Sequence, residues 1–323
     1  MSSWPDFSSL RALVIGDVMI DRYVHGSVER ISPEAPVPVV RKLRQEDRLG
    51  GAANVAVNLR ALGVRAEVAG ATGTGNTAAL LAQLLDAAGV GHQLLVRDAQ
   101  RPTTVKTRVL SQSQQLLRID RESTEPLATE VEDRLLEGIR SRLAEQSVDL
   151  LILQDYNKGV MTANLIVEAL AAARRYGIMT AVDPKFNHFW SYRGCGMFKP
   201  NLREIQQQLD FKLAPEPGAL DRAAAQIFER LDCSELLITL SEHGIYSHDG
   251  RRSQIHPTQA RRIADVSGAG DTVISVAAAA RVAGMELAGA ARLANLAGAQ
   301  VIARPGVVAV SAEELRLAWL NTE

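Results

Sequence analysis

Four short apolar runs, each ending in a polar residue, constrain the fold of this chain most strongly. They are ALVIGD (residues 12–17), DLLILQD (149–155), IMTAVDP (178–184) and LLITLS (236–241). Continuous apolar runs of this length are typical of strands buried on both faces of a parallel sheet. Segments with helical periodicity lie between them, at residues 52–63, 76–89, 126–146, 162–176, 218–231, 271–284 and 286–302. This alternation predicts an α/β fold in which helices cover a mostly parallel sheet.

Polar residues follow the predicted strands where each strand ends. They are Asp17, Asp155, Asp183 and Thr239. Ligands of open α/β sheets bind beyond the carboxyl ends of the strands. Strand termination alone explains any one of these residues, but four distant segments that share the pattern predict a binding site at one sheet edge.

Two regions break the alternation. Residues 22–44 contain three prolines and little helical period, and residues 103–119 read as two extended strands around a polar SQSQ turn. We interpret both as antiparallel strands outside the main sheet. They predict a small β lid, made of about 22–44 and 101–120, on a single domain that spans residues 1–323 and has one active site.

Charge, cysteine content and the N-terminus exclude several protein classes. The 323 residues include 36 Lys and Arg against 37 Asp and Glu, so bulk attraction to nucleic acid is not expected. Cys195 and Cys233 form no CxxC pair, which favours free thiols in a reducing compartment over a disulfide or a zinc site. The sequence shows neither a signal peptide nor a membrane-spanning run, so we expect a cytoplasmic protein without membrane contact.

The most specific local motif is DVSGAGDTV (265–273), directly before a helical segment rich in Ala and Val. Gly268 and Gly270 allow a tight turn whose N–H groups, at a helix N-terminus, can bind an anion. Asp271 then lies beside the anion, where a carboxylate is useful if it accepts a proton from an attacking hydroxyl. An Asp that merely interacts with the helix dipole is the alternative.

Other phosphate and metal motifs are absent from the sequence. It has no GxxxxGK[ST], the Gly73-Thr-Gly75 stretch lacks the third glycine of the dinucleotide pattern, and no HExxH occurs. A NAD-dependent enzyme and a P-loop NTPase are therefore disfavoured. A non-catalytic protein that binds a sugar or a nucleotide remains an alternative at this point.

The motifs occur in the order found in one family. They are GDVMIDRY (16–23), GGAANVAVNL (50–59), KPNLREI (199–205), TLSEHG (239–244) and DVSGAGDTV (265–273). Over about residues 11–311 the chain resembles the ribokinase-like (PfkB) carbohydrate kinases. This resemblance implies a three-layer α/β/α fold with a β-sheet lid, and an ATP-dependent phosphotransferase that uses an alcohol group as acceptor.

Four further stretches resemble one branch of that family, the D-glycero-β-D-manno-heptose-7-phosphate kinases of lipopolysaccharide core biosynthesis. They are RISPEAPVPVV (30–40), TTVKTRVLSQSQQLLRID (103–120), QDYNKGV (154–160) and VDPK (182–185). The resemblance implies phosphorylation of O1 to give the 1,7-bisphosphate. The alternative is a PfkB-type kinase for another sugar, sugar phosphate or nucleoside. Because two-module relatives also carry a nucleotidyltransferase, we expect another protein to perform any adenylyl transfer.

The resemblance also implies roles for individual residues. Asp271 matches the catalytic base, and Gly268, Ala269 and Gly270 match the anion hole for the transferred phosphoryl group. The sugar ligands it implies are Asp17, Asp21, Gly50, Gly51 and Asn54. The basic residues that could neutralise a phosphate on the sugar are Lys106, Arg108 and Arg118 of the lid, with Lys185 near the nucleotide.

On the nucleotide side the resemblance implies Asn201 and Glu204, with Glu204 acting on Mg²⁺ indirectly. The pair also fits a helix N-cap with a carboxylate at the third helical position, and both interpretations can hold together. Further matches to the nucleotide side are Thr239, Ser241, Gly244 and Asn295. Carbonyl groups near Asp265 and Val266 could hold a monovalent cation such as K⁺.

The resemblance also implies a homodimer, because lid strands in this family pair between subunits. Two departures from the family pattern stand out. Ser267 stands where Thr is more common, and the bulky segment FNHFWSYRG (186–194) follows VDPK where a Gly-led segment is usual. We expect that segment near the nucleotide and acceptor edge.

Overall fold

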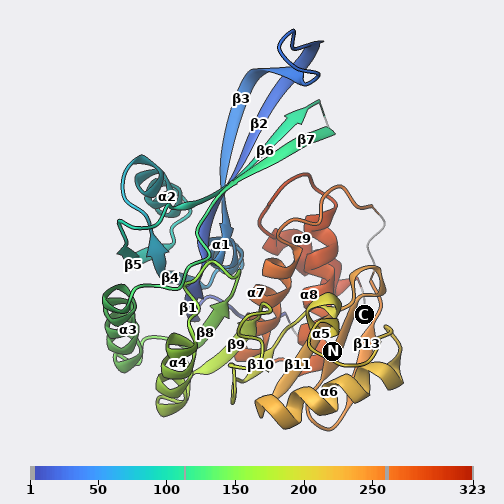
Figure 1. The fold of residues 1–323 in the computed structure, drawn as a ribbon. Coiled ribbons are helices and arrows are strands. Elements are labelled where there is room, and N and C mark those ends of the chain that lie inside the picture. Colours follow the sequence, from blue (N-terminus) through green and yellow to red (C-terminus); the bar gives the residue numbers. More distant parts are fainter. Residues whose placement is uncertain (1–3, 113, 259–261, 322–323) are drawn as a thin grey trace.

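The computed structural model describes residues 4–112, 114–258 and 262–321. A large central sheet carries helices on both faces, and a smaller sheet projects from one end of it (Figure 1). The three-layer α/β/α prediction is confirmed. Ser113, in the predicted SQSQ turn, and the two ends of the predicted domain lie outside the described residues.

Within the described residues the central sheet has nine strands in the order β13-β12-β11-β10-β9-β8-β1-β4-β5. The strands from β5 to β11 pair in parallel, and β12 and β13 add antiparallel pairs at one edge. Their bounds are β1 (Arg11–Gly16), β4 (Arg65–Thr72), β5 (Gly91–Arg97), β8 (Leu150–Gln154), β9 (Met179–Asp183), β10 (Met197–Phe198), β11 (Glu235–Thr239), β12 (Ile245–His248) and β13 (Ser253–His256). The four predicted strands correspond to β1, β8, β9 and β11.

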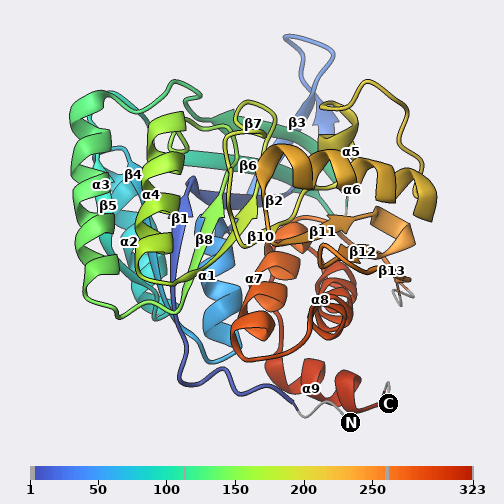
Figure 2. The same cartoon turned by 90° about the horizontal axis from the view of Figure 1, so that it is seen from below.

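Each predicted helical segment corresponds to a helix. These are α1 (Ala52–Ala61), α2 (Asn76–Ala87), α3 (Thr129–Ala144), α4 (Ala163–Arg175), α6 (Pro217–Leu231), α7 (Ala269–Val282) and α8 (Leu287–Ile302). The structure adds the short α5 (Leu202–Gln206) and α9 (Ala312–Leu320). Helices α1, α7 and α8 cover one face of the sheet, and α3, α4 and α6 cover the other (Figure 2).

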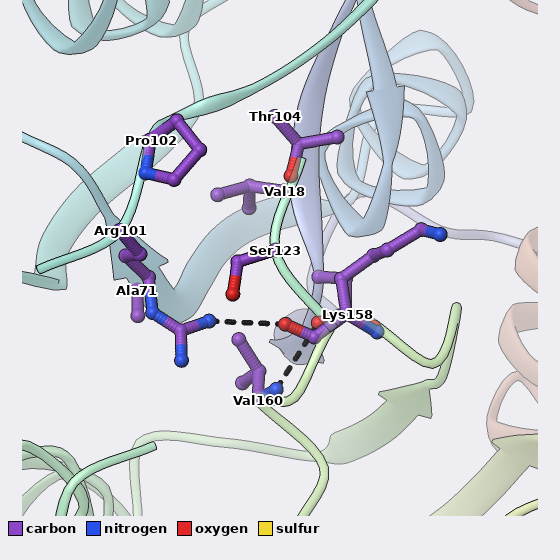
Figure 3. A pocket seen from close by; sticks show the side chains of 9 residues that line it. Val18, Ala71, Arg101, Pro102, Thr104, Ser123, Lys158 and Val160 are labelled. Carbon is purple, nitrogen blue, oxygen red and sulfur yellow. Dashed lines mark hydrogen bonds between the residues drawn. The ribbon is translucent and has the colours of Figure 1, made fainter. Parts of the chain in front are cut away.

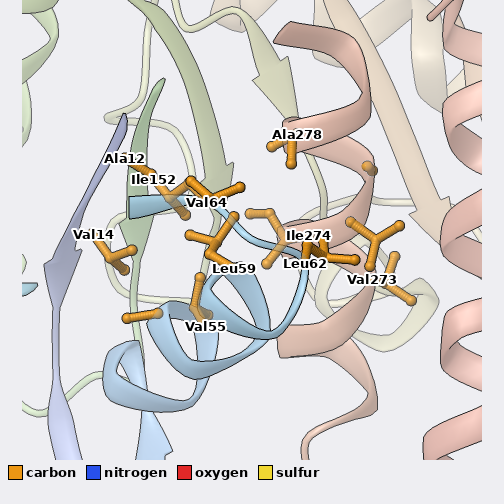
Figure 4. Close-up of a cluster of buried hydrophobic side chains, with 14 of the residues drawn as sticks. Ala12, Val14, Val55, Leu59, Leu62, Val64, Ile152, Val273, Ile274 and Ala278 are labelled. Atoms are coloured by element: carbon orange, nitrogen blue, oxygen red, sulfur yellow. The ribbon is translucent and has the colours of Figure 1, made fainter. Parts of the chain in front are cut away.

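The strands separate two apolar cores because alternate side chains of each strand face opposite helical layers. In β1, Ala12 and Val14 join the core of α1 and α7, whereas Leu13 and Ile15 join the core of α3 and α4. Figure 4 shows the first core between strands and helices. Burial on both faces explains why these strands read as continuous apolar runs. Among the described residues no helix is long and apolar enough to cross a membrane.

The smaller sheet, called the lid below, has the order β3-β2-β6-β7. Its strands are β2 (Val18–Ile31), β3 (Pro38–Gly51), β6 (Thr104–Ser111) and β7 (Gln114–Arg121). The hairpins β2–β3 and β6–β7 are antiparallel as expected, but β2 pairs with β6 in parallel, so the sheet is mixed. The first hairpin extends beyond residues 22–44. Only Asp17 lies between β1 and β2, and β3 is followed directly by α1.

Candidate active site

The carboxyl ends of β1, β8 and β9 lie side by side and bring polar residues together. The Asp17 N–H donates to the Gln154 carbonyl at 3.3 Å, and the Asp155 N–H donates to the Asp183 carbonyl at 3.0 Å. The carboxylates of Asp17, Asp155 and Asp183 are buried. Thr239 ends β11, two strands beyond β9, so it belongs to another part of the same edge.

Helix α7 begins beside this edge with Gly268 as its N-cap residue. Its φ is +81°, and a Cβ there would lie 2.9 Å from Nδ2 of Asn54 and 3.3 Å from Cγ1 of Val307. Both the backbone and the available space therefore favour glycine. The Ala269 N–H donates to the Val266 carbonyl at 3.3 Å, whereas that of Gly270, the next in the first turn, has no partner within the helix and can bind an anion.

Asp271 in the first turn of α7 is held by three donors. Its Oδ1 accepts from the Tyr156 hydroxyl at 2.7 Å and from Nε2 of Gln154 at 3.1 Å, and its Oδ2 accepts from Nδ2 of Asn54 at 2.8 Å. Burial raises the pKa of Asp271 to about 7, assisted by the charge of Asp183 and opposed by the Asn54 and Tyr156 hydrogen bonds. A carboxylate with this pKa is suited to general-base catalysis near neutral pH.

A buried ion pair lies next to this turn. Lys199, directly after β10, places Nζ 3.1 Å from Oδ2 of Asp183, and both side chains are at most 7% exposed. A Cβ at Gly270 would lie 3.7 Å from the same Nζ, so the positive charge faces the anion-binding turn. Nε2 of Gln154 joins the two carboxylates by donating to Asp183 and Asp271, each at 3.1 Å.

Asp17 accepts hydrogen bonds from the loop that follows β8. Its Oδ2 takes the N–H groups of Tyr156 at 2.8 Å and Lys158 at 3.1 Å, and its Oδ1 takes that of Val160 at 3.2 Å. Burial, with the charge of Asp155, raises the pKa of Asp17 to about 6 against these hydrogen bonds. Figure 3 shows the small pocket beside this loop, which Arg101, Pro102 and Thr104 also line.

Asp21 lies where the lid meets the core. The Arg108 guanidinium on neighbouring β6 pairs with its buried carboxylate. A Cβ at Gly50 would overlap Oδ2 of Asp21, and Gly51 has φ +59° and would overlap the Asp17 carbonyl. These glycines let the two lid strands approach each other closely beside Asp21.

The other predicted lid cations pair with acidic side chains of β7 and the residue after it. Nζ of Lys106 lies 3.4 Å from Asp120 and 3.1 Å from Glu122, and Nε of Arg118 lies 3.0 Å from Asp120. Lys106 is mostly buried, whereas the Arg118 side chain is 52% exposed. Arg118 is therefore the more accessible of the two to an incoming anion.

Asn201 and Glu204 form the predicted helix cap at the start of α5. The Glu204 N–H donates to Oδ1 of Asn201, and the Asn201 N–H donates to Oε2 of Glu204, each at 2.8 Å. Lys185 pairs with the same carboxylate and lies 5.4 Å from the Tyr156 ring centre. Burial opposes the charge of Lys185, but Asp183 and Glu204 outweigh it and raise its pKa. This group extends the edge from Asp271 towards α5.

The remaining predicted nucleotide residues shape turns further along the edge. Thr239 forms a parallel bridge with Asn201, Ser241 has φ +57°, and Gly244 has φ +94° where a Cβ would overlap the His256 carbonyl. Nδ2 of Asn295 donates to the carbonyls of His256 and Pro257. A cleft of about 160 Å³ opens beside Asn295, lined by Gln254, Ile255, His256, Pro257, Arg292, Asn295 and Leu296.

The residues fit an indirect role of Glu204 towards Mg²⁺. Its oxygens already accept from the Asn201 N–H and Lys185, and Mg²⁺ usually retains several waters and binds substrate phosphates. Contact through water is compatible with both. In the described part of the chain no group of three His, Cys, Asp or Glu side chains could hold a metal ion. The monovalent-cation site at Asp265 and Val266 stays a prediction.

Three residues of the site were not singled out from the sequence: Tyr156, Gln154 and Lys199. Gln154 and Tyr156 lie within the QDYNKGV stretch, and Lys199 is the first residue of KPNLREI. Their location within these family-like motifs was the only sequence signal that could have identified them. Most of the bulky side chains of residues 186–194 do not point into the site. Phe189 and Tyr192 are buried in the core of α3 and α4, whereas Phe186 is 41% exposed.

Sequence comparison relates the chain to known proteins. It is 46% identical over 326 residues to "Bifunctional protein HldE" of Pseudomonas savastanoi pv. phaseolicola, covering 99% of this chain and 66% of that protein. It is 46% identical over 317 residues to the protein of the same name from Pseudomonas aeruginosa, with 98% and 65% coverage. The chain thus spans about two thirds of the length of these relatives.

Solved structures share the fold at low identity. A phosphofructokinase-2 from Escherichia coli in complex with substrates and products gives a TM-score of 0.80 at 18% identity, covering 97% of this chain and 98% of that one. A ribokinase from Arabidopsis thaliana complexed with ribose and ATP gives 0.74 at 18%, with 95% and 98% coverage. The model of the pfkB family of carbohydrate kinases matches residues 9–314. The chain belongs to the PfkB family of carbohydrate kinases, and it is a sugar phosphotransferase.

Proposed function

We propose that this kinase transfers the γ-phosphoryl group of ATP to O1 of D-glycero-β-D-manno-heptose 7-phosphate. The segments RISPEAPVPVV (30–40) and TTVKTRVLSQSQQLLRID (103–120), which resemble heptose-7-phosphate kinases, support this acceptor. The 46% identity to HldE is consistent with it. The observation that carries the proposal is Asp271, a buried carboxylate with a pKa near neutrality at the start of α7.

In the proposed mechanism Asp271 takes the proton of the O1 hydroxyl as O1 attacks the γ-phosphorus in line. The Gly268–Gly270 turn and Lys199 stabilise the negative charge that develops on the transferred group. Glu204 would hold Mg²⁺ through water, and the ion would supply positive charge to neutralise the ATP phosphates. A carboxylate with three donors keeps one lone-pair position for the incoming hydroxyl, on Oδ2.

The acceptor is proposed to lie between the core and the lid. Asp21 and Arg108 are at this junction, and the Asp21 carboxylate occupies the space that a side chain at Gly50 would take. Lys106 lies on β6 with Arg108, Arg118 lies on the neighbouring β7, and both are proposed to meet the phosphate of the sugar. Arg108 can turn from Asp21 to a phosphate because a guanidinium forms bidentate pairs with both groups.

A panel of acceptors with Mg·ATP tests the proposal. The panel contains heptose 7-phosphate, the unphosphorylated heptose, fructose 6-phosphate, ribose and adenosine. We expect the highest kcat/KM with heptose 7-phosphate and a new anomeric phosphate in the ³¹P NMR spectrum. Higher turnover with another acceptor would instead establish the alternative, a PfkB kinase with a different substrate.

We also propose that two copies pair through the lid. The strand register places Val24, Val109 and Leu117 in one row, and Thr107 and Ile119 in the next with the Asp47-paired Arg22, on the face opposite Asp21. Leu117 and Ile119 are 46% and 57% exposed, and burial of an apolar sheet face favours association.

Ile119→Asp should shift the sedimentation coefficient to that of a monomer. Val167→Asp, at a site 56% exposed on α4, is the matched control, and an unchanged Ile119→Asp dimer would exclude this interface.

A further inference from the structure

We propose that Asp17 and Tyr156 act as a pair of positioning residues: Asp17 fixes the loop after β8, and the Tyr156 hydroxyl of that loop orients the base Asp271. The inference rests on the phosphotransferase role of Asp271. It gives Asp17 a role other than the sugar contact that its position in the sequence implies.

The first step is the use of the Asp17 carboxylate. Three backbone N–H groups, at residues 156, 158 and 160, donate to its two oxygens over 2.8–3.2 Å. A carboxylate has about four acceptor positions, so most of its capacity is taken up by the loop. Asp17 is also only 2% exposed. These contacts describe a loop anchor.

The second step is the conformation of the loop. Asn157 has φ +53° and Gly159 has φ +83°, where a Cβ would overlap the Glu125 carbonyl. Two left-handed residues within three positions fold the chain tightly and point alternate N–H groups inward. If Asp17 did not accept them, these N–H groups would lose their hydrogen-bond partner, which would destabilise this conformation of the loop.

The third step joins the loop to the base. The Tyr156 hydroxyl donates to Oδ1 of Asp271 at 2.7 Å, while Gln154, on the last position of β8, donates to the same oxygen. Asn54 holds Oδ2 from the other side. Tyr156 and Gln154 therefore fix the plane of the carboxylate and leave Oδ2 to receive the acceptor proton. Asn54 keeps its hydrogen bond to Oδ2 when that proton arrives.

The Tyr156 bond also favours the ionised base. A hydroxyl that donates to a carboxylate stabilises the charged form, in the same direction as Asn54. The charged groups that act on Asp271 are Asp183 at the end of β9, Lys199 after β10 and Lys185 after β9. Tyr156→Phe leaves all of these in place and removes one donor, so the acid limb of its kcat/KM profile reports Tyr156 alone.

The matched control is Tyr192. Its hydroxyl, also buried, donates to Oδ2 of Asp155 at 2.9 Å and does not reach Asp271. Tyr192→Phe thus removes a comparable phenol–carboxylate hydrogen bond next to the same loop. A merely structural role of Tyr156 would give the two Phe variants similar behaviour.

The experiment measures kcat/KM against pH with the best acceptor of the panel. Tyr156→Phe should move the acid limb up by about one pH unit, a loss of roughly fivefold at pH 7 that disappears by about pH 9. Tyr192→Phe should leave the limb in place. An unmoved limb in Tyr156→Phe, or equal movement in both variants, would overturn the role of Tyr156.

A double-variant cycle tests the role of Asp17. Asp17→Asn should move the limb in the same direction as Tyr156→Phe and add little in the Tyr156→Phe background, because both act through one contact. Asp17→Glu, which keeps the charge but displaces it, is the second variant and should behave alike. A rise in acceptor KM alone, equal in both backgrounds, would show that Asp17 binds the sugar directly and overturn the pairing.

A titration without acceptor separates this inference from the choice of substrate. The ¹³C carboxyl signal of Asp271, assigned by its loss in Asp271→Asn, should titrate near pH 7 in the native protein and higher in Tyr156→Phe. If no acceptor of the panel is turned over but this shift occurs, the proposed substrate fails and the positioning role stands. If heptose 7-phosphate is turned over and the signal is unmoved, the positioning role fails alone.

Discussion

Nδ2 of Asn54 in α1 lies 2.8 Å from Oδ2 of Asp271 in α7, and the turn that starts α7 closes over this contact. A Cβ at Gly268 would lie 2.9 Å from the same Asn54 nitrogen. The backbone of the anion-binding turn, the base and the helix that supports it are therefore packed as one unit. A substitution in the turn should therefore displace Asn54 and alter its hydrogen bond to Asp271.

Gly268→Ala should lower activity through this contact. Both Gly268 (φ +81°) and Gly284 (φ +92°) have left-handed backbone, so an Ala costs about 1–2 kcal/mol at either position. A Cβ at Gly284 meets nothing within 4 Å, whereas one at Gly268 displaces Asn54. We expect kcat of Gly268→Ala to fall at least about tenfold below that of Gly284→Ala, a difference of 1.4 kcal/mol. Equal kcat values would show that the contact is dispensable.

Asp271→Asn should abolish most of the turnover while it preserves nucleotide binding. General-base catalysis contributes about 10²–10⁴-fold, so kcat should fall by at least about 10²-fold. Asp221→Asn is the matched control, because Asp221 also accepts a tyrosine hydroxyl at 2.7 Å, from Tyr246, but lies on α6. Steady-state kinetics and calorimetric titration with ATP measure the two effects. Near-normal turnover of Asp271→Asn would remove its assignment as the base.

The raised pKa values of Asp271 and Asp17 predict how stability depends on pH. Each carboxyl binds its proton more tightly in the folded state, so its contribution is full below about pH 4 and is lost as pH rises through about 6 for Asp17 and about 7 for Asp271. Between pH 5.5 and 8, Asp271 alone should lower the free energy of unfolding by about 2 kcal/mol. Urea unfolding of the native protein and of Asp271→Asn at both pH values measures this. Parallel losses in the two proteins would contradict it.

The buried Asp183–Lys199 pair predicts a rescue. Lys199→Met leaves Asp183 buried without its cation and should lower the free energy of unfolding by about 3–5 kcal/mol. Asp183→Asn combined with Lys199→Met removes both charges and should recover much of that stability. The double variant should remain poor in turnover, because the positive charge beside Gly270 is gone. A double variant less stable than the single one would show that the pair acts through more than its charges.

The sequence predicted those parts of the fold and site that depend on local pattern. The strands β1, β8 and β9 are buried on both faces, so their apolar runs stand out. The Asn201–Glu204 cap spans only four residues, so it was also visible as a local pattern. The short β10 (Met197–Phe198) and the edge strand β5, with its mixed burial, carry no comparable pattern.

The rest of the site depends on contacts between distant segments. The Asp17 carboxylate bonds backbone N–H groups 139–143 residues later, and a backbone donor leaves no trace in the sequence. In the sequence Lys199 cannot be distinguished from a surface lysine, because its partner Asp183 lies at the end of another strand, β9. Tyr156 gains its contact with Asp271 only because the first turn of α7 lies beside the loop that follows β8. In each case tertiary packing determines the partner, and local sequence does not.

The first hairpin of the lid, β2–β3, is joined to the core by almost no chain, whereas residues 98–103 and 122–128 connect β6 and β7 to β5 and α3. One residue, Asp17, separates β1 from β2, and β3 passes into α1 with none between. β2 and β3 have 14 residues each. At about 3.3 Å per residue the hairpin extends about 45 Å from the junction at Asp17 and Gly51. A turn of about 10° there moves the tip by about 8 Å. The carboxylate that anchors the active-site loop thus lies at the junction of the lid and the core, so a rotation of the first hairpin about this junction would act on the loop that orients Asp271.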